Sequence, residues 1–362
     1  MKNKKIKIGI TQGDINGVGY EVIFKTFASS GMFEFCTPII YGSPKAAAYH
    51  RKSLELNTSF SIISSADEAE DNKLSVLNCT DDDVRVEFSQ EDKAAGKAAL
   101  QALEAVVEDY KKGLIDVIVT GPINKHTIHS AEFNFPGHTE YLENRLGEGD
   151  DSLMILMNER IRIAVATGHI PIVKVAEVLS QELIEDKIAV FNESLIGDFG
   201  IAQPRIAVLG LNPHAGDNGL IGSEEIELIK PAIDAMAEEG VLCYGPFPAD
   251  GFMGSGGFNS FDGVLAMYHD QGLIPFKVLA MDDGVNFTAG LPVIRTSPAH
   301  GTAYDIAGKG VADETSFRQS VYTAIDIFRY RELQDEVQEN PLRKHYFNRR
   351  DDSDQLDLEK ED

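Results

Sequence analysis

Three histidines follow apolar, strand-like runs at the same relative position. They are His169, His214 and His269, 45 and 55 residues apart along the chain. In an open α/β sheet the carboxyl ends of the strands meet at one edge, where ligands bind, so distant residues of this kind can come together. Three neutral imidazoles suit a divalent transition metal that keeps one position open for substrate. A histidine that only caps its strand is the alternative, and it explains one such residue better than three.

Carboxylates accompany these histidines. Asp270 directly follows His269, and Asp250 lies in a Gly- and Pro-rich stretch, Gly245–Gly251. Such groups can orient a metal-bound imidazole or take a proton, although Asp250 could equally satisfy the backbone of a turn. With Lys277 they form the set of candidate catalytic residues, and the sequence does not choose among the three.

Cationic and polar residues follow His269 in the sequence. Lys277, Asn286 and Arg295 would suit a phosphate or carboxylate, and the arginine can grip such a group with two parallel hydrogen bonds. Lone surface cations are the alternative for any one of them. The stretch Gly17–Gly19 lacks the third glycine of a dinucleotide fingerprint, and Gly308–Gly310 lacks the spacing of a phosphate-binding loop. A standard nucleotide site is therefore disfavoured.

Short runs rich in Ile and Val alternate with helical patterns, which predicts an α/β fold. The runs read as strands of a buried parallel sheet. The clearest of them are Lys7–Thr11, Leu114–Thr120, Ile161–Thr167, Arg205–Leu211, Gly263–Tyr268 and Pro292–Thr296. Apolar residues at three- and four-residue spacing predict helices over Ala94–Lys112 and Ser223–Glu239. A length of 362 residues favours about two domains.

Charge and composition exclude several classes of protein. The net charge of −25 argues against a nucleic-acid binder or a protein of anionic membrane surfaces. No apolar run reaches the length of a membrane span, and three cysteines without a Cys-x-x-Cys pair fit a reducing cytoplasm. Residues 65–93 hold ten acidic and three basic residues and are expected to form an exposed insertion or a solvated edge. The acidic tail 351–362 is expected to be disordered.

An ordered set of segments resembles the PdxA family of pyridoxal phosphate biosynthesis. The segments are Gly9–Asp14, Val119–Lys125, Phe135–Glu140, Gly168–Pro171, Leu211–Gly216, Tyr268–Gly272 and His300–Gly310. Each motif alone is weak, but the set in this order is specific and spans about residues 6–330. The resemblance implies an isocitrate/isopropylmalate dehydrogenase-like fold of two α/β domains with a cleft between them. The first domain would comprise residues 1–130 and 296–345, and the second residues 131–295.

The resemblance also implies a homodimer that uses NAD and one divalent metal, such as zinc, cobalt, magnesium or manganese. His169, His214 and His269 match the family's metal ligands, which both subunits contribute. The family's substrate contacts correspond to His138, Thr139, Lys277, Asn286 and Arg295. The segment from His300 resembles the adenosine-side loop of isopropylmalate dehydrogenases, and His300, Gly301, Ala303 and Asp305 are its expected cofactor contacts.

The implied activity is an oxidative decarboxylation of 4-phosphooxy-L-threonine, giving 3-amino-2-oxopropyl phosphate and carbon dioxide in pyridoxal 5′-phosphate biosynthesis. One alternative is a paralogous dehydrogenase of 4-phospho-D-threonate or 4-phospho-D-erythronate in sugar-acid catabolism. Another is a metal-dependent binding or phosphotransacetylase-like protein without dehydrogenase activity. Residues 300–310 argue against this last alternative.

Overall fold

The computed structural model of the chain describes residues 5–81, 84–130, 133–147 and 152–339. The acidic tail 351–362 and the end of the first predicted domain, residues 340–345, lie outside this part. Among the described residues, no helix combines the length and apolar character needed to cross a membrane. Cys36, Cys79 and Cys243 are all free thiols, as the sequence predicts.

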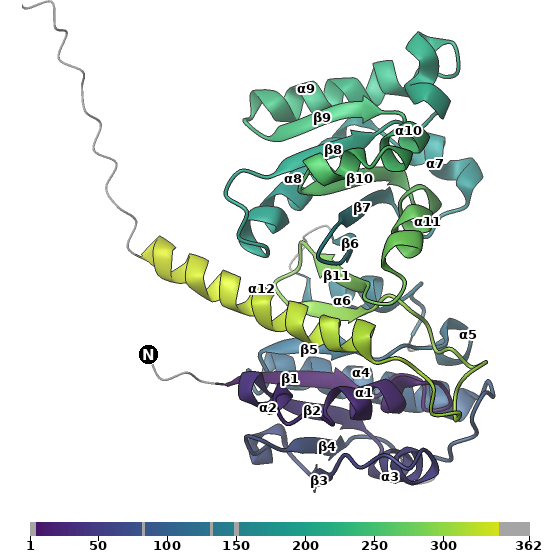
Figure 1. Cartoon of the computed structure of the whole chain (residues 1–362), viewed down its shortest axis with the longest axis vertical. Helices are drawn as coiled ribbons and strands as arrows, with labels where there is room; N and C mark the ends of the chain where they lie inside the picture. The colour runs from purple at the N-terminus through teal and green to yellow at the C-terminus, as the bar shows by residue number, and fades with distance from the viewer. Residues whose placement is uncertain (1–4, 82–83, 131–132, 148–151, 340–362) are drawn as a thin grey trace, which may run out of the picture.

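Twelve strands of the described residues form one sheet along the molecule (Figure 1). In sequence order they are β1 Ile6–Thr11, β2 Cys36–Gly42, β3 Phe60–Ile63, β4 Leu74–Asn78, β5 Val117–Thr120, β6 Leu153–Met157, β7 Arg162–Thr167, β8 Arg205–Leu209, β9 Leu242–Phe247, β10 Gly263–Tyr268, β11 Val285–Ala289 and β12 Arg295–Pro298. Their order across the sheet is β3-β4-β2-β1-β5-β12-β11-β6-β7-β10-β8-β9. The α/β class is thereby confirmed.

The sheet consists of two parallel sets joined by antiparallel strands. Strands β3, β4, β2, β1, β5 and β12 pair in parallel, as do β7, β10, β8 and β9. Between the sets, β11 is antiparallel to both β12 and β6, and β6 is antiparallel to β7. The expectation of a purely parallel sheet is therefore wrong at its centre, because β6 and β7 form a hairpin closed by a hydrogen bond from Asn158 N to Ile161 O (3.0 Å).

Helices cover both faces of this sheet (Figure 1). The α-helices are α1 Gly19–Thr26, α2 Met32–Phe35, α3 Pro44–Ser53, α4 Lys93–Lys111, α5 Lys125–Ile128, α6 His138–Leu146, α7 Val175–Val178, α8 Gln181–Gly197, α9 Lys230–Glu238, α10 Ala249–Gly254, α11 His269–Ala280 and α12 Thr315–Glu339. Side chains at the N-caps explain several helix starts: Ser43, Asp92, Asn124 and Ser180 each accept a hydrogen bond from the first turn. The predicted helix 223–239 contains a π-helical segment, Glu225–Ile229, before α9.

One face of the sheet carries a continuous apolar core, whereas the other face carries two separate clusters. The continuous core runs from Ile8 in β1 to Ile206 in β8 and includes Phe317 of α12. On the opposite face, a lower cluster packs around α4 and α6, and an upper cluster packs around α10 and α11. A gap in apolar packing is therefore left over the central strands.

Strand alternation places polar residues over that gap. Along β11, Val285, Phe287 and Ala289 belong to the continuous core, so Asn286 and Thr288 face the other side. Thr288 is paired in register with Arg295 of β12, and the two side chains share a hydrogen bond. The alternation of side chains along two short strands thus places these polar residues together on the face opposite the continuous core.

The structure corrects the expectation for residues 65–93 and leaves the division into two domains untested. Within 65–93, strand β4 is buried between β3 and β2, so the middle of this stretch is part of the sheet and not an exposed insertion. Its acidic residues flank the strand, which hid the short apolar run Leu74–Leu77. The sheet continues from β12 to β11 across the boundary of the two predicted domains, and that division stays a prediction.

Candidate functional site

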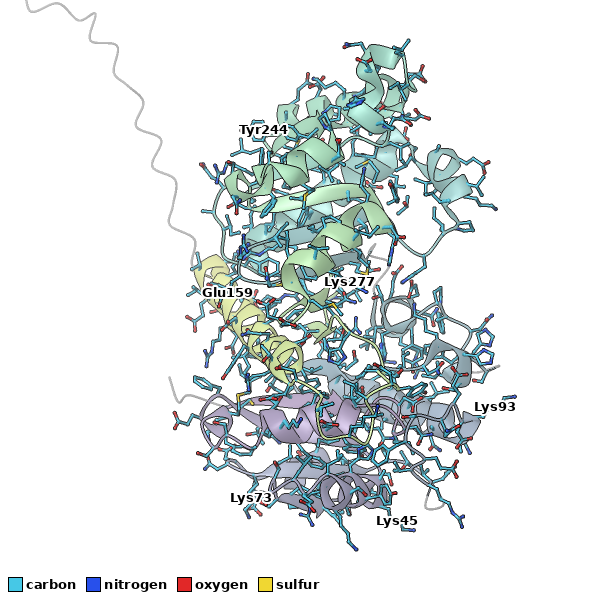
Figure 2. All side chains as sticks on the ribbon, turned by 45° about the vertical axis from the view of Figure 1, so that its right-hand side comes forward. Lys45, Lys73, Lys93, Glu159, Tyr244 and Lys277 are labelled. Carbon is cyan, nitrogen blue, oxygen red and sulfur yellow. The ribbon has the colours of Figure 1, made fainter. Side chains whose placement is uncertain are left out.

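A cleft of about 310 Å³ lies over the central strands. All five expected substrate contacts line it: His138 and Thr139 of α6, Lys277 of α11, Asn286 of β11 and Arg295 of β12. His169, His269, His300 and Gly301 line it too. Figure 2 shows Lys277 at the end of α11 that approaches the lower half of the molecule. The topology thus brings together residues that lie between positions 138 and 301 of the sequence.

Arg295 is the buried cation of this cleft, with 2% of its surface exposed. Its Nε and one terminal nitrogen donate to Thr120 Oγ1 (3.1 and 2.6 Å), and the other terminal nitrogen donates to Thr288 Oγ1 (3.4 Å). Burial lowers the pKa of Arg295 to about 10, which still leaves it charged at neutral pH. These described hydrogen-bond partners are neutral, and Glu140 acts on Arg295 only through its charge, so the guanidinium can still bind an anion directly.

His138 lies beside Arg295 and is held as a neutral donor. Burial, and then the charges of Arg295 and Lys125, lower the pKa of His138 well below its usual range. Arg295 donates to Nδ1 of this imidazole (3.2 Å), so the proton of the neutral ring belongs on Nε2. That Nε2 is buried without a partner among the described residues. The pair therefore presents a positive charge and a neutral N–H to the cleft.

Other buried polar atoms around the cleft also lack partners in the described chain. They are Asn286 Oδ1, Glu140 Oε2 and His300 Nε2. Burial lowers the pKa of His300, which keeps that imidazole neutral. Because buried polar atoms in folded proteins are normally hydrogen-bonded, several such atoms around one hollow indicate a polar ligand.

Two of the three expected metal ligands meet at the edge of the cleft. The rings of His169 and His269 have centroids 5.5 Å apart. Nδ1 of His269 lies 2.7 Å from Asp270 Oδ1, and Nδ1 of His169 lies 3.2 Å from Glu140 Oε1. A carboxylate on Nδ1 fixes the tautomer whose Nε2 lone pair can bind a metal. Both rings therefore fit a metal site, although Lys125 Nζ now lies 3.4 Å from His169 Nε2.

His214 does not join this pair within the chain, contrary to the argument from strand ends. Residues His214–Asn218 take left-handed backbone angles, and the loop that they form carries His214 to an exposed position. In the described ranges no cluster of three or more His, Cys, Asp or Glu side chains could hold a metal. A single chain thus offers two imidazoles of the expected three.

The remaining predicted residues lie outside the lining of the cleft. Asp250 is exposed in α10, and Asp270 is exposed beside His269, where it lines a neighbouring hollow of about 240 Å³. Ala303 and Asp305 follow the part of the 300–310 segment that reaches the cleft. Of the three candidate catalytic residues, Lys277 is therefore the one whose side chain faces the cleft in this chain.

Sequence reasoning passed over Lys125 and Glu140 as site residues. Both line the cleft, and both contact His169. Burial raises the pKa of Glu140, but the hydrogen bond and charge of His169, with the charge of Lys125, lower it overall. Lys125 is the last residue of the motif Val119–Lys125, and Glu140 is the last residue of the motif Phe135–Glu140. Their positions in these two motifs are the sequence feature that could have identified them as site residues.

The α/β fold and its cleft define the class of this protein as an α/β protein with a binding site for a small anionic molecule. A family model described as pyridoxal phosphate biosynthetic protein PdxA matches residues 34–324. The 4-hydroxythreonine-4-phosphate dehydrogenase of Bacteroides thetaiotaomicron is 65% identical over 359 residues, which cover 99% of each chain. The D-threonate 4-phosphate dehydrogenase of Cupriavidus necator is 40% identical over 318 residues, 87% of this chain and 95% of that protein.

Among solved structures, the 4-hydroxythreonine-4-phosphate dehydrogenase of Klebsiella pneumoniae matches with a TM-score of 0.77. It is 35% identical, and the match covers 91% of this chain and 99% of that chain. The chain therefore belongs to the PdxA family and is a dehydrogenase. A dehydrogenase of this kind works with a nicotinamide cofactor.

Proposed function

We propose that the protein oxidises 4-phosphooxy-L-threonine with NAD and releases carbon dioxide and 3-amino-2-oxopropyl phosphate, in the cytoplasmic synthesis of pyridoxal 5′-phosphate. The observation that carries this proposal is the pair of Arg295 and His138. A buried guanidinium without a carboxylate partner among the described residues, beside a neutral N–H donor, suits the phosphate of such a substrate. The 65% identity to the Bacteroides dehydrogenase supports the choice of substrate.

The substrate would be held along the cleft by groups of complementary charge. Arg295, His138 and Thr139 would bind the phosphate, and Lys277 and Asn286 would bind the remaining polar groups. Oxidation of the C3 hydroxyl sends a hydride to NAD and releases a proton. The resulting β-keto acid loses carbon dioxide, and the electron pair left on carbon takes up a proton. We propose Lys277 for this proton transfer, since Asp250 and Asp270 do not line the cleft.

The two cleft histidines fit a divalent metal, with His214 of a second copy as the third ligand. Zinc, cobalt, magnesium and manganese are the candidates. When bound, the metal would supply a Lewis acid that polarises the substrate hydroxyl. Asp270 and Glu140 contact Nδ1 of the two rings, so Nε2 is the atom of each ring that would bind the metal.

Exposed apolar side chains support a homodimer with a shared site. Ile172 and Val173 are 75% and 74% exposed beside the hollow that borders His169 and His269. On the adjoining helix α11, Ile274 and Val278 are 63% and 80% exposed. A monomer rarely leaves so many large apolar side chains in water near its active site, and a second copy would cover them.

The cofactor would lie along the segment that begins at His300. His300 and Gly301 border the cleft, and Ala303 and Asp305 continue away from it. This placement would bring the nicotinamide to the substrate and leave the adenosine side on the 300–305 segment.

The proposal is tested by NADH formation with purified, metal-supplied protein. We expect strong turnover of 4-phosphooxy-L-threonine that a chelator abolishes. Preference for 4-phospho-D-threonate or 4-phospho-D-erythronate would indicate a role in sugar-acid catabolism instead. These substrates are included because the D-threonate 4-phosphate dehydrogenase of Cupriavidus is 40% identical to this chain. If no substrate gave NADH, the proposal would be contradicted and a binding or phosphotransacetylase-like role would be favoured.

Replacement of Glu140 by Ala is expected to weaken metal binding by about 10- to 100-fold, because the carboxylate that orients His169 is lost. Glu140→Gln, which can still accept the hydrogen bond from Nδ1, should retain most of the affinity. Metal affinity is measured by competition with a chromophoric chelator, without substrate. Equal affinity in Glu140→Ala and the unmodified protein would show that His169 needs no such support.

A further inference from the structure

A hydrogen-bonded network below the cleft joins three segments that are far apart in the sequence. Tyr304 Oη donates to Asp14 Oδ2 (2.7 Å), and Asn124 Nδ2 donates to Tyr304 Oη (3.1 Å). Asp14 is 1% exposed, and its Oδ1 accepts a hydrogen bond from Asn16 N (2.8 Å). The three residues come from three of the motifs that carry the family resemblance, yet none has a role in the site described above.

The direction of these hydrogen bonds is set by the environment of the network. Burial raises the pKa of Asp14, and its hydrogen bonds with Tyr304, Asn16 and Thr127 oppose that rise. Burial and the hydrogen bond to Asp14 raise the pKa of Tyr304 above the usual range, so the phenol keeps its proton. Tyr304 therefore serves as a permanent donor to Asp14 and an acceptor from Asn124.

On one side, this network holds the segment expected to contact the cofactor. Val18 N donates to Thr302 O (3.0 Å), and a Cβ at Gly17 would lie only 2.7 Å from that oxygen. Ala303 has φ of +46°, a left-handed conformation that is strained for an L-residue. Tyr304 is the next residue, so its side-chain contacts help to keep the strained backbone of Ala303 in place.

On the other side, the network reaches the cleft itself. Asn124 caps α5, because its Oδ1 accepts a hydrogen bond from His126 N (2.8 Å). The first residue of α5 is Lys125, whose Nζ lies 3.4 Å from His169 Nε2. The phenol oxygen of Tyr304 thus links the 300–305 segment to the helix that supplies a cation to the cleft.

We propose that Tyr304 is a positioning residue for the dinucleotide, which holds residues 300–305 against Asp14 and α5 in the conformation that binds the cofactor. The inference rests on the proposed function, since it assumes that this segment receives a nicotinamide dinucleotide. Loss of the hydroxyl would leave the carboxylate of Asp14 and the amide of Asn124 short of a buried partner. The segment would then bind cofactor more weakly, whereas Asn124 would still cap α5 through its Oδ1 and keep the groups around the substrate in place.

The test is the variant Tyr304→Phe, with NAD binding measured by titration calorimetry on the full-length protein with divalent metal. We expect the dissociation constant for NAD to rise about tenfold or more, as for the loss of a hydrogen bond to a buried carboxylate. The kcat at saturating NAD should stay within about threefold of the unmodified protein, and the KM for NAD should rise with the dissociation constant.

Tyr41→Phe is the matched control. Like the partly buried Tyr304, the buried Tyr41 donates through Oη to a carboxylate, Asp109 Oδ2, at 2.9 Å, but it lies in β2 outside the lining of the cleft. Its loss should lower thermal stability without changing NAD affinity. Equal NAD affinity in Tyr304→Phe and the unmodified protein, or equal weakening in Tyr41→Phe, would overturn the positioning role. Failure of the unmodified protein to bind NAD would instead overturn the proposed function.

Discussion

Replacement of Arg295 by Met is expected to lower kcat/KM for the phosphorylated substrate by about a thousandfold. Removal of one partner from a buried, charge-assisted contact typically costs about 2–5 kcal/mol, and each 1.4 kcal/mol is a factor of ten. Arg295 is the cleft cation that is fully buried, and it also orients His138 through Nδ1. The variant should therefore lose the phosphate charge pair and the fixed imidazole donor together.

Steady-state kinetics and a thermal melt of the same preparation check this result. Met keeps much of the length of the side chain and removes a buried charge, so we expect a folded protein. Arg162→Met is the matched control, since Arg162 is partly buried and lies over Phe199 (4.8 Å) outside the lining of the cleft. Retention of kcat/KM within tenfold in Arg295→Met, or an equal loss in Arg162→Met, would contradict the phosphate assignment.

Two inactive variants are expected to restore activity when they are combined in one dimer. His169→Ala and His214→Ala should each abolish turnover and bound metal while leaving the fold largely intact. In our proposal a site takes His169 and His269 from one subunit and His214 from the other. A mixed dimer would then contain one intact site, and random assortment of two variants would restore about a quarter of the sites.

The two variants would be co-expressed with different tags, and the mixed dimer would be purified through both tags. The matched control combines His169→Ala with His269→Ala, which damage the same half of the shared site. That mixed dimer has no intact site and should stay inactive. Equal recovery in both combinations, or full activity of His214→Ala alone, would refute the shared metal centre.

Local patterns in the chain were enough to predict several elements and the chemistry at their ends. Strand β10 has the predicted bounds Gly263–Tyr268, β1 begins one residue before its predicted start, and α4 differs from prediction by one residue at each end. Such elements depend on neighbouring side chains: a run of β-branched residues, or a helical spacing of apolar residues after a capping Asp92. Motif order also indicated the family, which the relatives confirm.

Other elements depended on partners that the local pattern does not contain. The run predicted as Pro292–Thr296 became β12 at Arg295–Pro298, because the strand begins where it can pair with β5 and β11. The sequence pattern does not reveal strand β4 inside an acidic stretch, although pairing with β2 and β3 on both edges buries it. In both cases long-range hydrogen bonding decided which residues became strand.

The three histidines show the same division within the candidate site. Their equal position after strand-like runs predicted imidazoles at strand ends, and the sequence pattern could go no further. The tertiary structure brought His169 and His269 together, because β7 and β10 are parallel neighbours whose carboxyl ends share an edge. It also turned His214 outward through a left-handed loop, since the path of a chain beyond its strand depends on contacts that strand periodicity does not encode.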